Sequence, residues 1–238
     1  MSEKTVVTTV ENGVMVIRLD NLSMNNGTTY VEQNLINDAF EEAIGNPEVK
    51  VIVFTGTGKY FHTGGRVPQH ATAEIKKAHT DSVSRSNRVM AMINKPLIAV
   101  VNGECSAGGM SILLNADMAV AVDTAEFGFS EALRGGFPAM IIPQVMDYIP
   151  KKKLLESCFT GNLFSAETAF TYGLLNYVVK EEDLWPTVNG LIEKITRMNP
   201  ELLSIGRKYY YSLVPMDKES RVTRSREFLQ EVLAIQTR

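Results

Sequence analysis

Two glycine-rich stretches carry the residues best suited to chemistry. They are "YFHTGGR" at 60–66 and "GECSAGGM" at 103–110, and each follows an apolar, β-branched run. Glycine adopts positive φ and lets a ligand approach the backbone, and a turn at a helix start leaves several N–H groups unpaired. Two such turns on neighbouring strands can each direct one N–H at the same oxygen, which is an oxyanion hole. The pattern fits ordinary strand-to-helix turns as well, whereas "GTGKY" lacks the spacing of a phosphate-binding loop.

The segments that must position these turns alternate between strands and helices. "VKVIVFTGTG" at 49–58 and "KPLIAVVNG" at 95–103 predict strands buried on both faces. An Asn12-Gly13 turn predicts an N-terminal hairpin. The other expected elements are helices over 31–44 with Gly45 as C-cap, over about 71–93 and over 108–117, a strand with its exit over 118–129, and helices in most of the chain from 143, including 142–149, 151–161 and 165–175.

Composition predicts one globular α/β unit. The 238 residues are 45% apolar and 21% charged, and the net charge of -3 gives no reason to expect nucleic acid or an anionic membrane as partner. Cys105 and Cys158 are expected to be reduced thiols. No segment is typical of a signal peptide, and no apolar run reaches the roughly 18 residues of a membrane span. We therefore expect a cytoplasmic protein.

The pairing of the two turns resembles a known family. "KPLIAVVNGECSAGGMSILLNADMAVA" is similar to the signature of the crotonase (enoyl-CoA hydratase/isomerase) superfamily, and "KYFHTGG" resembles the first oxyanion loop of that family. "AEFGFSEALRGGFPAMIIPQV" and "LESCFTGNLFSAETAFTYGLLNYVV" resemble its later strand and helices. The likeness spans about residues 5–213. It implies an α/β, crotonase-like ββα spiral core over 1–190, and a C-terminal helical segment over 191–238 that serves oligomerisation or covers the site within the same functional unit.

The resemblance implies roles for both turns. The N–H groups of Gly65 and Gly108 would hold the thioester oxygen of an acyl-CoA as it becomes an enolate. Thr63, Gly64 and Gly109 would belong to the substrate-binding surface, with Gly109 letting the helix pack close to the thioester. No metal is implied, and coenzyme A enters only as part of the substrate.

The acidic residues of the family are only half present. Family hydratases carry two acids, and at the position of the first this chain has Ser111, which would contact substrate. Glu131 stands at the position of the second, which family isomerases keep as their single acid–base group. An apolar pocket would raise its pKa toward neutrality. An exposed acid, or one that caps the next helix, is the alternative for Glu131.

Three residues depart from the family or invite another role. Arg66 replaces a common aspartate, which alters the anchoring of the loop or places a cation near a carboxylated substrate. His62 lies beside the loop and is a candidate acid, although a lone histidine is more often a packing residue. Cys105 has no histidine or acid at an obvious activating spacing, which argues against a nucleophile.

The expected contacts to coenzyme A are incomplete. "NLSMNNGTT" at 21–29 resembles the adenine-binding loop and includes Asn26, but the basic residue that often precedes it is missing. Lys208, beside Arg207, would supply a basic contact; a solvated basic face is the alternative. An acyl-carrier-protein thioester is therefore an alternative substrate.

The resemblance favours enoyl-CoA double-bond isomerisation. The alternatives are a hydratase, dehydratase or decarboxylase acting on a CoA- or carrier-protein-linked substrate, and a non-catalytic acyl-CoA-binding homologue. We expect a homotrimer or hexamer, and a pocket lined by residues 66–90 and by the helices after Gly136.

Overall fold

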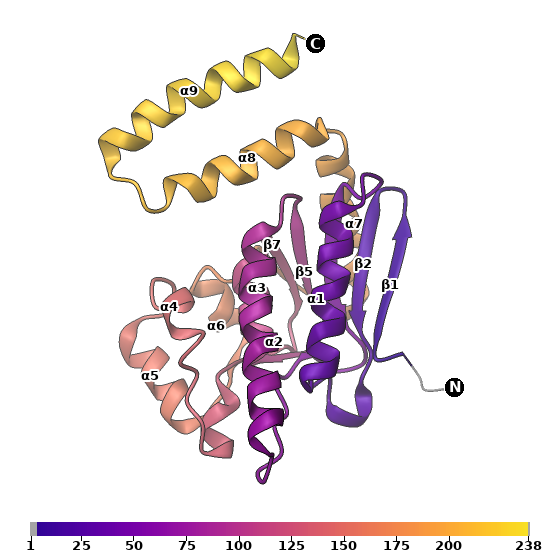
Figure 1. Cartoon of the computed structure of the whole chain (residues 1–238), viewed down its shortest axis with the longest axis vertical. Coiled ribbons are helices and arrows are strands. Elements are labelled where there is room, and N and C mark those ends of the chain that lie inside the picture. Colours follow the sequence, from indigo (N-terminus) through magenta and orange to yellow (C-terminus); the bar gives the residue numbers. More distant parts are fainter. Residues whose placement is uncertain (1–3, 238) are drawn as a thin grey trace.

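The computed structural model describes residues 4–237 and contains two β-sheets with helices packed around them (Figure 1). The strands are β1 (Val6–Glu11), β2 (Val14–Leu19), β3 (Val51–Gly56), β4 (Tyr60–His62), β5 (Leu97–Val101), β6 (Glu104–Ser106), β7 (Met118–Val122), β8 (Glu126–Gly128), β9 (Phe164–Ser165) and β10 (Tyr177–Val179). The larger sheet has the order β1-β2-β3-β5-β7-β10, and the smaller one β4-β6-β8-β9. In the larger sheet only β1 and β2 pair antiparallel.

The helices occur in the predicted order, and some of them are shorter than predicted. They are η1 (Leu22–Met24), α1 (Tyr30–Gly45), α2 (Ala73–Met92), α3 (Gly108–Asn115), η2 (Ser130–Arg134), α4 (Ile142–Val145), α5 (Lys151–Thr160), α6 (Ala166–Thr171), η3 (Glu181–Asp183), α7 (Leu184–Thr196), α8 (Pro200–Leu213) and α9 (Lys218–Gln236). The α/β class, the hairpin at Asn12-Gly13 and the two buried strands are confirmed. The helices predicted over 142–149 and 165–175 are wrong in extent, since α4 and α6 are shorter.

The predicted C-cap of α1 is also wrong. Gly45 is the last helical residue, and Asn46 follows in an extended conformation (φ -82°, ψ 112°) with its N–H donating to Glu42 O over 2.9 Å. Pro47 explains the difference, because a residue before proline is disfavoured in the helical region. The start of α1 is fixed by its N-cap residue Thr29, whose N–H donates to the Glu32 carboxylate over 2.8 Å.

Each of the two central strands turns out of the larger sheet and continues into the smaller one. β3 and β5 are fully buried and pair in parallel, so they end at the same edge and are followed there by β4 and β6. The corners require glycine: a Cβ on Gly56 would lie 2.0 Å from Tyr60 O, and one on Gly103 would lie 2.0 Å from Lys59 O. This edge therefore brings the two glycine-rich turns side by side.

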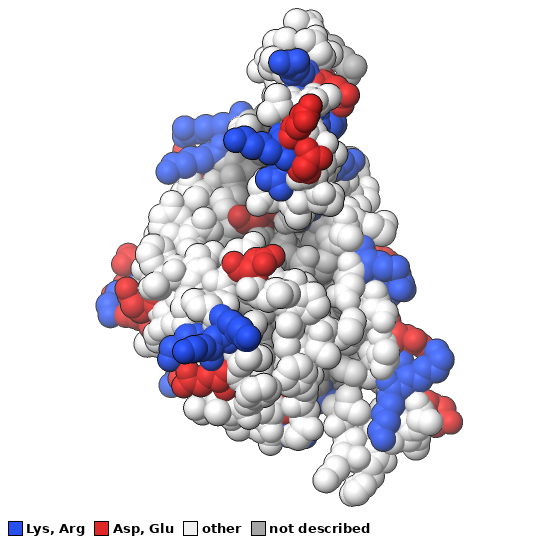
Figure 2. Space-filling model, turned by 90° about the vertical axis from the view of Figure 1, so that its left-hand side faces the viewer, with Lys and Arg blue, Asp and Glu red and all other residues white. Residues whose placement is uncertain are grey.

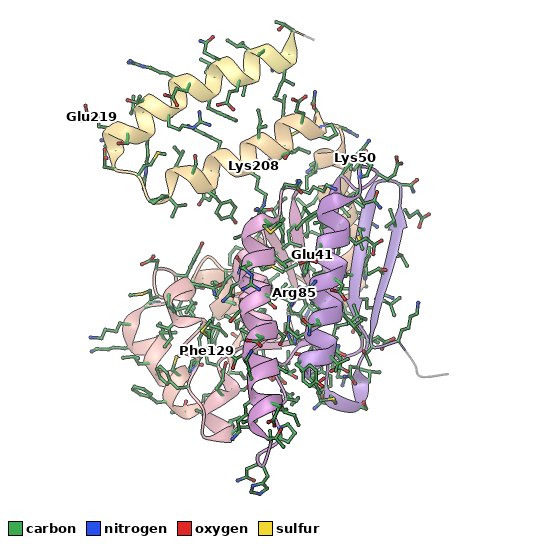
Figure 3. The ribbon with its side chains drawn as sticks, in the orientation of Figure 1. Glu41, Lys50, Arg85, Phe129, Lys208 and Glu219 are labelled. Atoms are coloured by element: carbon green, nitrogen blue, oxygen red, sulfur yellow. The ribbon has the colours of Figure 1, made fainter. Side chains whose placement is uncertain are left out.

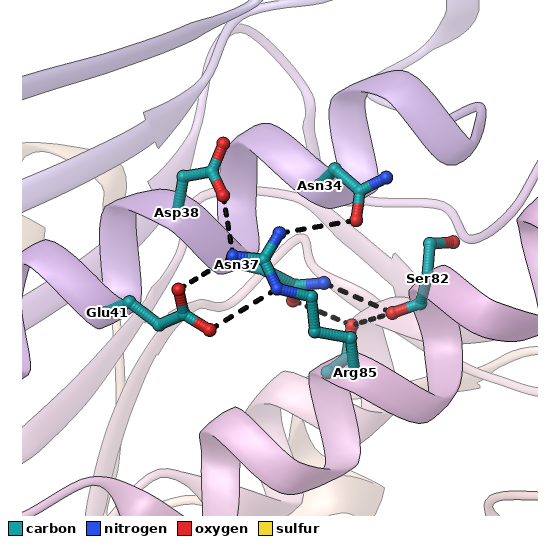
Figure 4. A network of polar contacts seen from close by, with 7 residues as sticks. Asn34, Asn37, Asp38, Glu41, Ser82 and Arg85 are labelled. Atoms are coloured by element: carbon teal, nitrogen blue, oxygen red, sulfur yellow. Dashed lines mark hydrogen bonds and ion pairs between the residues drawn. The ribbon is translucent and has the colours of Figure 1, made fainter.

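Helix α2 is held on α1 by polar contacts as well as by packing (Figure 4). Arg85 donates to Asp38 Oδ1 over 2.6 Å and to Glu41 Oε2 over 2.7 Å. Below it, the buried Asn37 amide donates to Ser82 O over 3.1 Å. Exposed ion pairs contribute little each, but a network that includes a buried amide fixes the register of the two helices.

The C-terminal helices divide into a packed part and a protruding part. Leu184 and Val188 are buried where α7 packs against the body. The predicted domain boundary between residues 190 and 191 therefore falls inside a packed helix. The pair α8–α9 stands away from the body (Figure 1), and no residue of either helix is buried in the described part of the chain. Charged side chains of both signs gather on this pair at the top of Figure 2. No helix in the part of the chain that the structure describes is long and apolar enough to cross a membrane.

Candidate active site

The first glycine turn directs one N–H away from the neighbouring chain segment at Thr28. Gly64 O accepts from Thr28 N–H over 3.0 Å, and Arg66 N–H donates to Thr28 O over 2.7 Å. Because C=O and N–H of one trans peptide point in opposite directions, the Gly65 N–H points away from Thr28. Gly65 lines a cavity on that side, so this N–H is available to a ligand.

The second turn presents another free N–H at the start of a helix. Gly108 is the first residue of α3, where an N–H has no partner within the helix. Ala107 precedes it with φ 49° and ψ -119°, a conformation that L-residues rarely adopt and that costs on the order of 1–3 kcal/mol. The two turns touch, because a Cβ on Gly64 would lie 3.0 Å from Gly108 N. The expectation of adjacent turns is confirmed.

A cavity of about 280 Å³ opens above the two turns. One face of α2 forms one wall, the start of α3 forms the base, and residues 131–144 form another wall. The predicted lining by the 66–90 segment and by the chain after Gly136 is confirmed. Residues that line it include Gly65, His79, Ser84, Asn87, Gly108, Ser111, Glu131, Arg134, Phe137, Met140 and Gln144.

Glu131 is the one carboxylate among the described residues that line this cavity. It lies at the start of η2, and its Oε2 is enclosed without a hydrogen-bond partner among the described residues. Burial raises the pKa of the carboxyl, while its own backbone N–H and the charge of Arg134 act more weakly in the opposite direction. A carboxylate that is poorly solvated and unpaired is a stronger base than one in water.

Ser111 lies one turn into α3 and also lines the cavity. It is three residues after Gly108, so the two residues lie on the same face of α3. The base of the cavity therefore carries a hydroxyl group rather than a second carboxylate.

Asn26 and Thr63 serve the loop instead of the cavity. Asn26 is fully buried, and its amide donates to Thr57 O and Tyr60 O over 3.1 and 2.6 Å. Thr63 is also buried, and its hydroxyl donates to Asn25 O over 2.8 Å. Both side chains are committed to the local fold and do not line the cavity, so a direct role of these side chains in substrate binding stays a prediction.

His62 and Cys105 are enclosed beneath the turns. His62 Nδ1 lies 3.0 Å from Asn26 O, and burial lowers the pKa of its imidazole to about 4, so the ring is neutral at pH 7. Gly109 packs on it so closely that a Cβ there would lie 2.1 Å from His62 O. Burial raises the pKa of the Cys105 thiol well above its ordinary value, which keeps it protonated. Neither side chain lines the cavity.

Arg66 braces the first turn. Its guanidinium donates to Thr63 O over 2.8 Å and to Gly64 O over 3.2 Å, and it also contacts the Thr63 hydroxyl. These bonds fix the peptide that carries the Gly65 N–H. The arginine thus takes over the anchoring of the loop.

Lys208 lines a neighbouring cavity of about 510 Å³ between α8 and the ends of α2 and α3. Figure 3 shows Lys208 on the side of α8 that faces the body. The two cavities share Asn87 and Gln144 in their walls. Arg207, in contrast, is bound to Asp117 over 2.9 Å and is not free for a phosphate.

The residues that the sequence did not reveal lie on the walls. His79 belongs to the face of α2 that repeats at 79, 83 and 87, and Arg134 follows Glu131 by three residues. Helical spacing relates the α2 positions to one another, but only the packing of α2 shows that this face meets the two turns.

The fold and site define a protein of the crotonase class. The structure of human enoyl-CoA hydratase domain-containing protein 3 superposes with a TM-score of 0.90 at 25% identity, over 97% of this chain and 92% of that one. A family model for enoyl-CoA hydratase/isomerase matches residues 9–234. The chain belongs to the enoyl-CoA hydratase/isomerase family.

Similar proteins include one named for its enoyl-CoA hydratase domain and one named as an enzyme. The mitochondrial enoyl-CoA hydratase domain-containing protein 3 of Rattus norvegicus is 29% identical over 214 residues, which are 87% of this chain and 70% of the rat protein. The hydroxycinnamoyl-CoA hydratase-lyase of Pseudomonas fluorescens is 28% identical over 208 residues, 84% of this chain and 75% of that enzyme. The cytoplasmic location and the homotrimer or hexamer stay predictions.

Proposed function

We propose that this protein is an acyl-thioester enzyme that forms an enolate held by the N–H groups of Gly65 and Gly108. The supporting observation is that both free N–H groups open onto the one cavity that also holds the enclosed carboxylate of Glu131. A thioester oxygen between the two donors gains negative charge only as the enolate forms, so the donors stabilise the transition state more than the ground state. Loss of one such donor typically costs about 2.7–4 kcal/mol in the barrier.

Glu131 is the acid–base group of the proposed reaction. Its carboxylate takes a proton from the α-carbon, the electrons of the C–H bond move into the enolate, and the thioester oxygen accepts the charge. The resulting carboxylic acid then returns the proton to the γ-carbon of an enoyl group, which shifts the double bond. One carboxylate is enough for this isomerisation, and the hydroxyl at Ser111 agrees with that requirement.

The substrate is proposed to be a coenzyme A thioester, as in the family name. Lys208 and the loop around Asn26 are the candidate contacts to the carrier part. Hydration of an enoyl thioester is the second candidate, because one relative at 28% identity is named a hydratase-lyase and another at 29% a probable enoyl-CoA hydratase.

The base role of Glu131 is tested by exchange of the α-proton. But-3-enoyl-CoA in deuterated water should gain deuterium and become but-2-enoyl-CoA with the wild-type protein, and Glu131→Gln should lower both rates at least about 100-fold, the lower end of general-base catalysis. Glu126→Gln is the matched control, since Glu126 is an exposed acid five residues away. Undiminished exchange in Glu131→Gln would remove Glu131 from this role.

Two further measurements separate the alternatives. The same assay with a pantetheine-linked carrier protein in place of coenzyme A shows which carrier is preferred. Binding of acyl-CoA without any turnover of short enoyl thioesters by the wild-type protein would make it the non-catalytic homologue.

A further inference from the structure

His79 stands against the oxyanion turn from the α2 wall. A Cβ on Gly65 would lie 2.4 Å from Cε1 and 2.9 Å from Nε2 of His79, so the imidazole ring fills the space where a side chain of residue 65 would be. Gly65 does not have positive φ, and its backbone conformation would allow another residue. The absence of a side chain at 65 therefore makes room for the ring, and Gly65 and His79 form a matched pair.

The ring also carries an unsatisfied polar atom. His79 Nδ1 is enclosed and has no hydrogen-bond partner among the described residues, as is true of Glu131 Oε2 in the same cavity. Leaving a buried polar atom unpaired is unfavourable, and such an atom in a native protein requires an explanation. Water or a polar part of the substrate that binds in this cavity supplies one.

The position of His79 is fixed from behind. Its carbonyl accepts from the Ser82 hydroxyl over 2.8 Å, and Ser82 O in turn accepts from the buried Asn37 amide. The same region of α2 is held to α1 by Arg85 (Figure 4). These bonds hold the backbone from which the His79 side chain extends, and a side chain that acts on a reacting atom requires a rigid support.

Few charges face the ring. The charged groups that line the cavity are Glu131 and Arg134, and a smaller hollow that His79 also lines is bordered by the charged Arg66 and the titratable Tyr30. Burial lowers the pKa of His79 below its ordinary 6.5, which leaves the imidazole neutral near pH 7 and able to accept a proton.

We propose that His79 is a second catalytic residue of this site, a general base that activates water and replaces the acid absent at Ser111. The proposal rests on the enolate function proposed above. His79 takes a proton from water as the water oxygen bonds to the β-carbon of an enoyl thioester. The electrons of the double bond pass into the enolate at Gly65 and Gly108, and the Glu131 carboxylic acid then gives its proton to the α-carbon. After product release the imidazolium returns its proton to the Glu131 carboxylate through solvent, so the net change is the addition of one water.

The test compares two rates in the same protein. But-2-enoyl-CoA and dec-2-enoyl-CoA report hydration, and but-3-enoyl-CoA in deuterated water reports α-exchange. For His79→Gln, the ratio of hydration to exchange should fall at least about 100-fold, as expected for the loss of a general base. His70→Gln, which changes an exposed histidine outside the cavity, should keep the wild-type ratio. His79→Asn provides a second variant if thermal unfolding shows that the glutamine variant is not folded.

The pH profile supplies a readout that a packing role would not change. Wild-type hydration requires a neutral His79 and a protonated Glu131. Its rate should therefore rise with pH as His79 loses its proton, with a pKa below 6.5, and fall again as Glu131 ionises, and the limb that belongs to His79 should be absent from the residual activity of His79→Gln. An unchanged ratio or an unchanged limb would overturn the proposal, as would a wild-type protein that exchanges the α-proton but hydrates neither enoyl thioester. Failure of the enolate function itself would be seen separately, as exchange that survives in Glu131→Gln.

Discussion

Burial of the Glu131 carboxyl couples its chemistry to the stability of the fold. Its pKa is raised above 4.5 in the folded state, so folding favours the protonated form. The corresponding contribution to stability is fully present below the unfolded pKa and is lost as pH rises through the folded pKa. Glutamine does not ionise, so Glu131→Gln avoids this loss of stability. The variant should therefore have a higher midpoint of thermal unfolding at pH 7 than the wild type.

The measurement is thermal unfolding of both proteins from pH 4 to pH 8. The advantage of Glu131→Gln should be small at pH 4 and grow as pH rises, with Glu126→Gln following the wild type. A difference that is constant across this range would show that ionisation of Glu131 is not its cause.

At the scale of residues, the sequence predicts those positions whose role lies in the backbone. Gly65, Gly108 and Ser111 have fixed spacing to their strands, so the motif places them in the cavity correctly. The environment of Asn26 could not be predicted from the motif, because its amide donates to Thr57 O and Tyr60 O, which belong to another part of the chain. His79 was missed because nothing in its own neighbourhood marks it; its contact with Gly65 depends on how α2 packs.

At the scale of elements, the close approach of α3 to β4 depends on Gly109. A Cβ there would lie 2.1 Å from His62 O, a backbone atom that cannot move without shifting β4. Gly109→Ala should therefore lower the free energy of unfolding by about 3 kcal/mol or more, at the upper end of overpacking effects. Urea unfolding measures this value.

Gly206→Ala is the control, because it makes the same substitution at a helical position that has no close neighbour. Nothing lies within 4 Å of a Cβ on Gly206 in α8, so the substitution brings only the higher helix propensity of alanine, worth about 1 kcal/mol. Equal effects of the two substitutions would contradict the close packing of α3 on β4.

Secondary structure was predictable wherever one periodicity extended over many residues. The buried runs of β3 and β5 and the amphipathic pattern of α1 belong to this class. The smaller sheet was not foreseen, because β4, β6 and β8 have three residues each and are too short to show alternation. The end of α1 was shifted by one residue because Pro47, rather than Gly45, terminates it.

At the scale of the whole molecule, one ion pair ties α8 to the body. Arg207 binds Asp117 over 2.9 Å and also donates to Ile93 O, and the two side chains are only 10% and 21% exposed. Removing one partner of a largely buried pair costs about 3–5 kcal/mol, because the other charge is left unpaired. Arg207→Met should release α8–α9 and increase proteolytic cleavage near residues 197–218, measured by limited trypsin digestion with mass spectrometry.

Lys208→Met is the control for that experiment, because it removes a neighbouring positive charge that has no ion-pair partner among the described residues. It removes one trypsin site as well, as Arg207→Met does. Equal cleavage of both variants and the wild type would show that the ion pair does not hold α8 in place.

The pair α8–α9 lacks a core of its own, which supports the prediction of a homotrimer or hexamer. Val222, Leu229 and Leu233 form an exposed apolar stripe along α9. Helices in proteins gain most of their stability from the packing of an apolar face, and exposed apolar patches mark interaction sites, so a second copy of the chain is expected to cover this stripe. Sedimentation velocity should show a trimer or hexamer, and Leu229→Glu with Leu233→Glu should shift it toward the monomer. Gln230→Glu with Ala234→Glu introduces the same two charges at exposed positions on another face of α9 and should leave the assembly intact, whereas a monomeric wild-type protein would contradict the prediction.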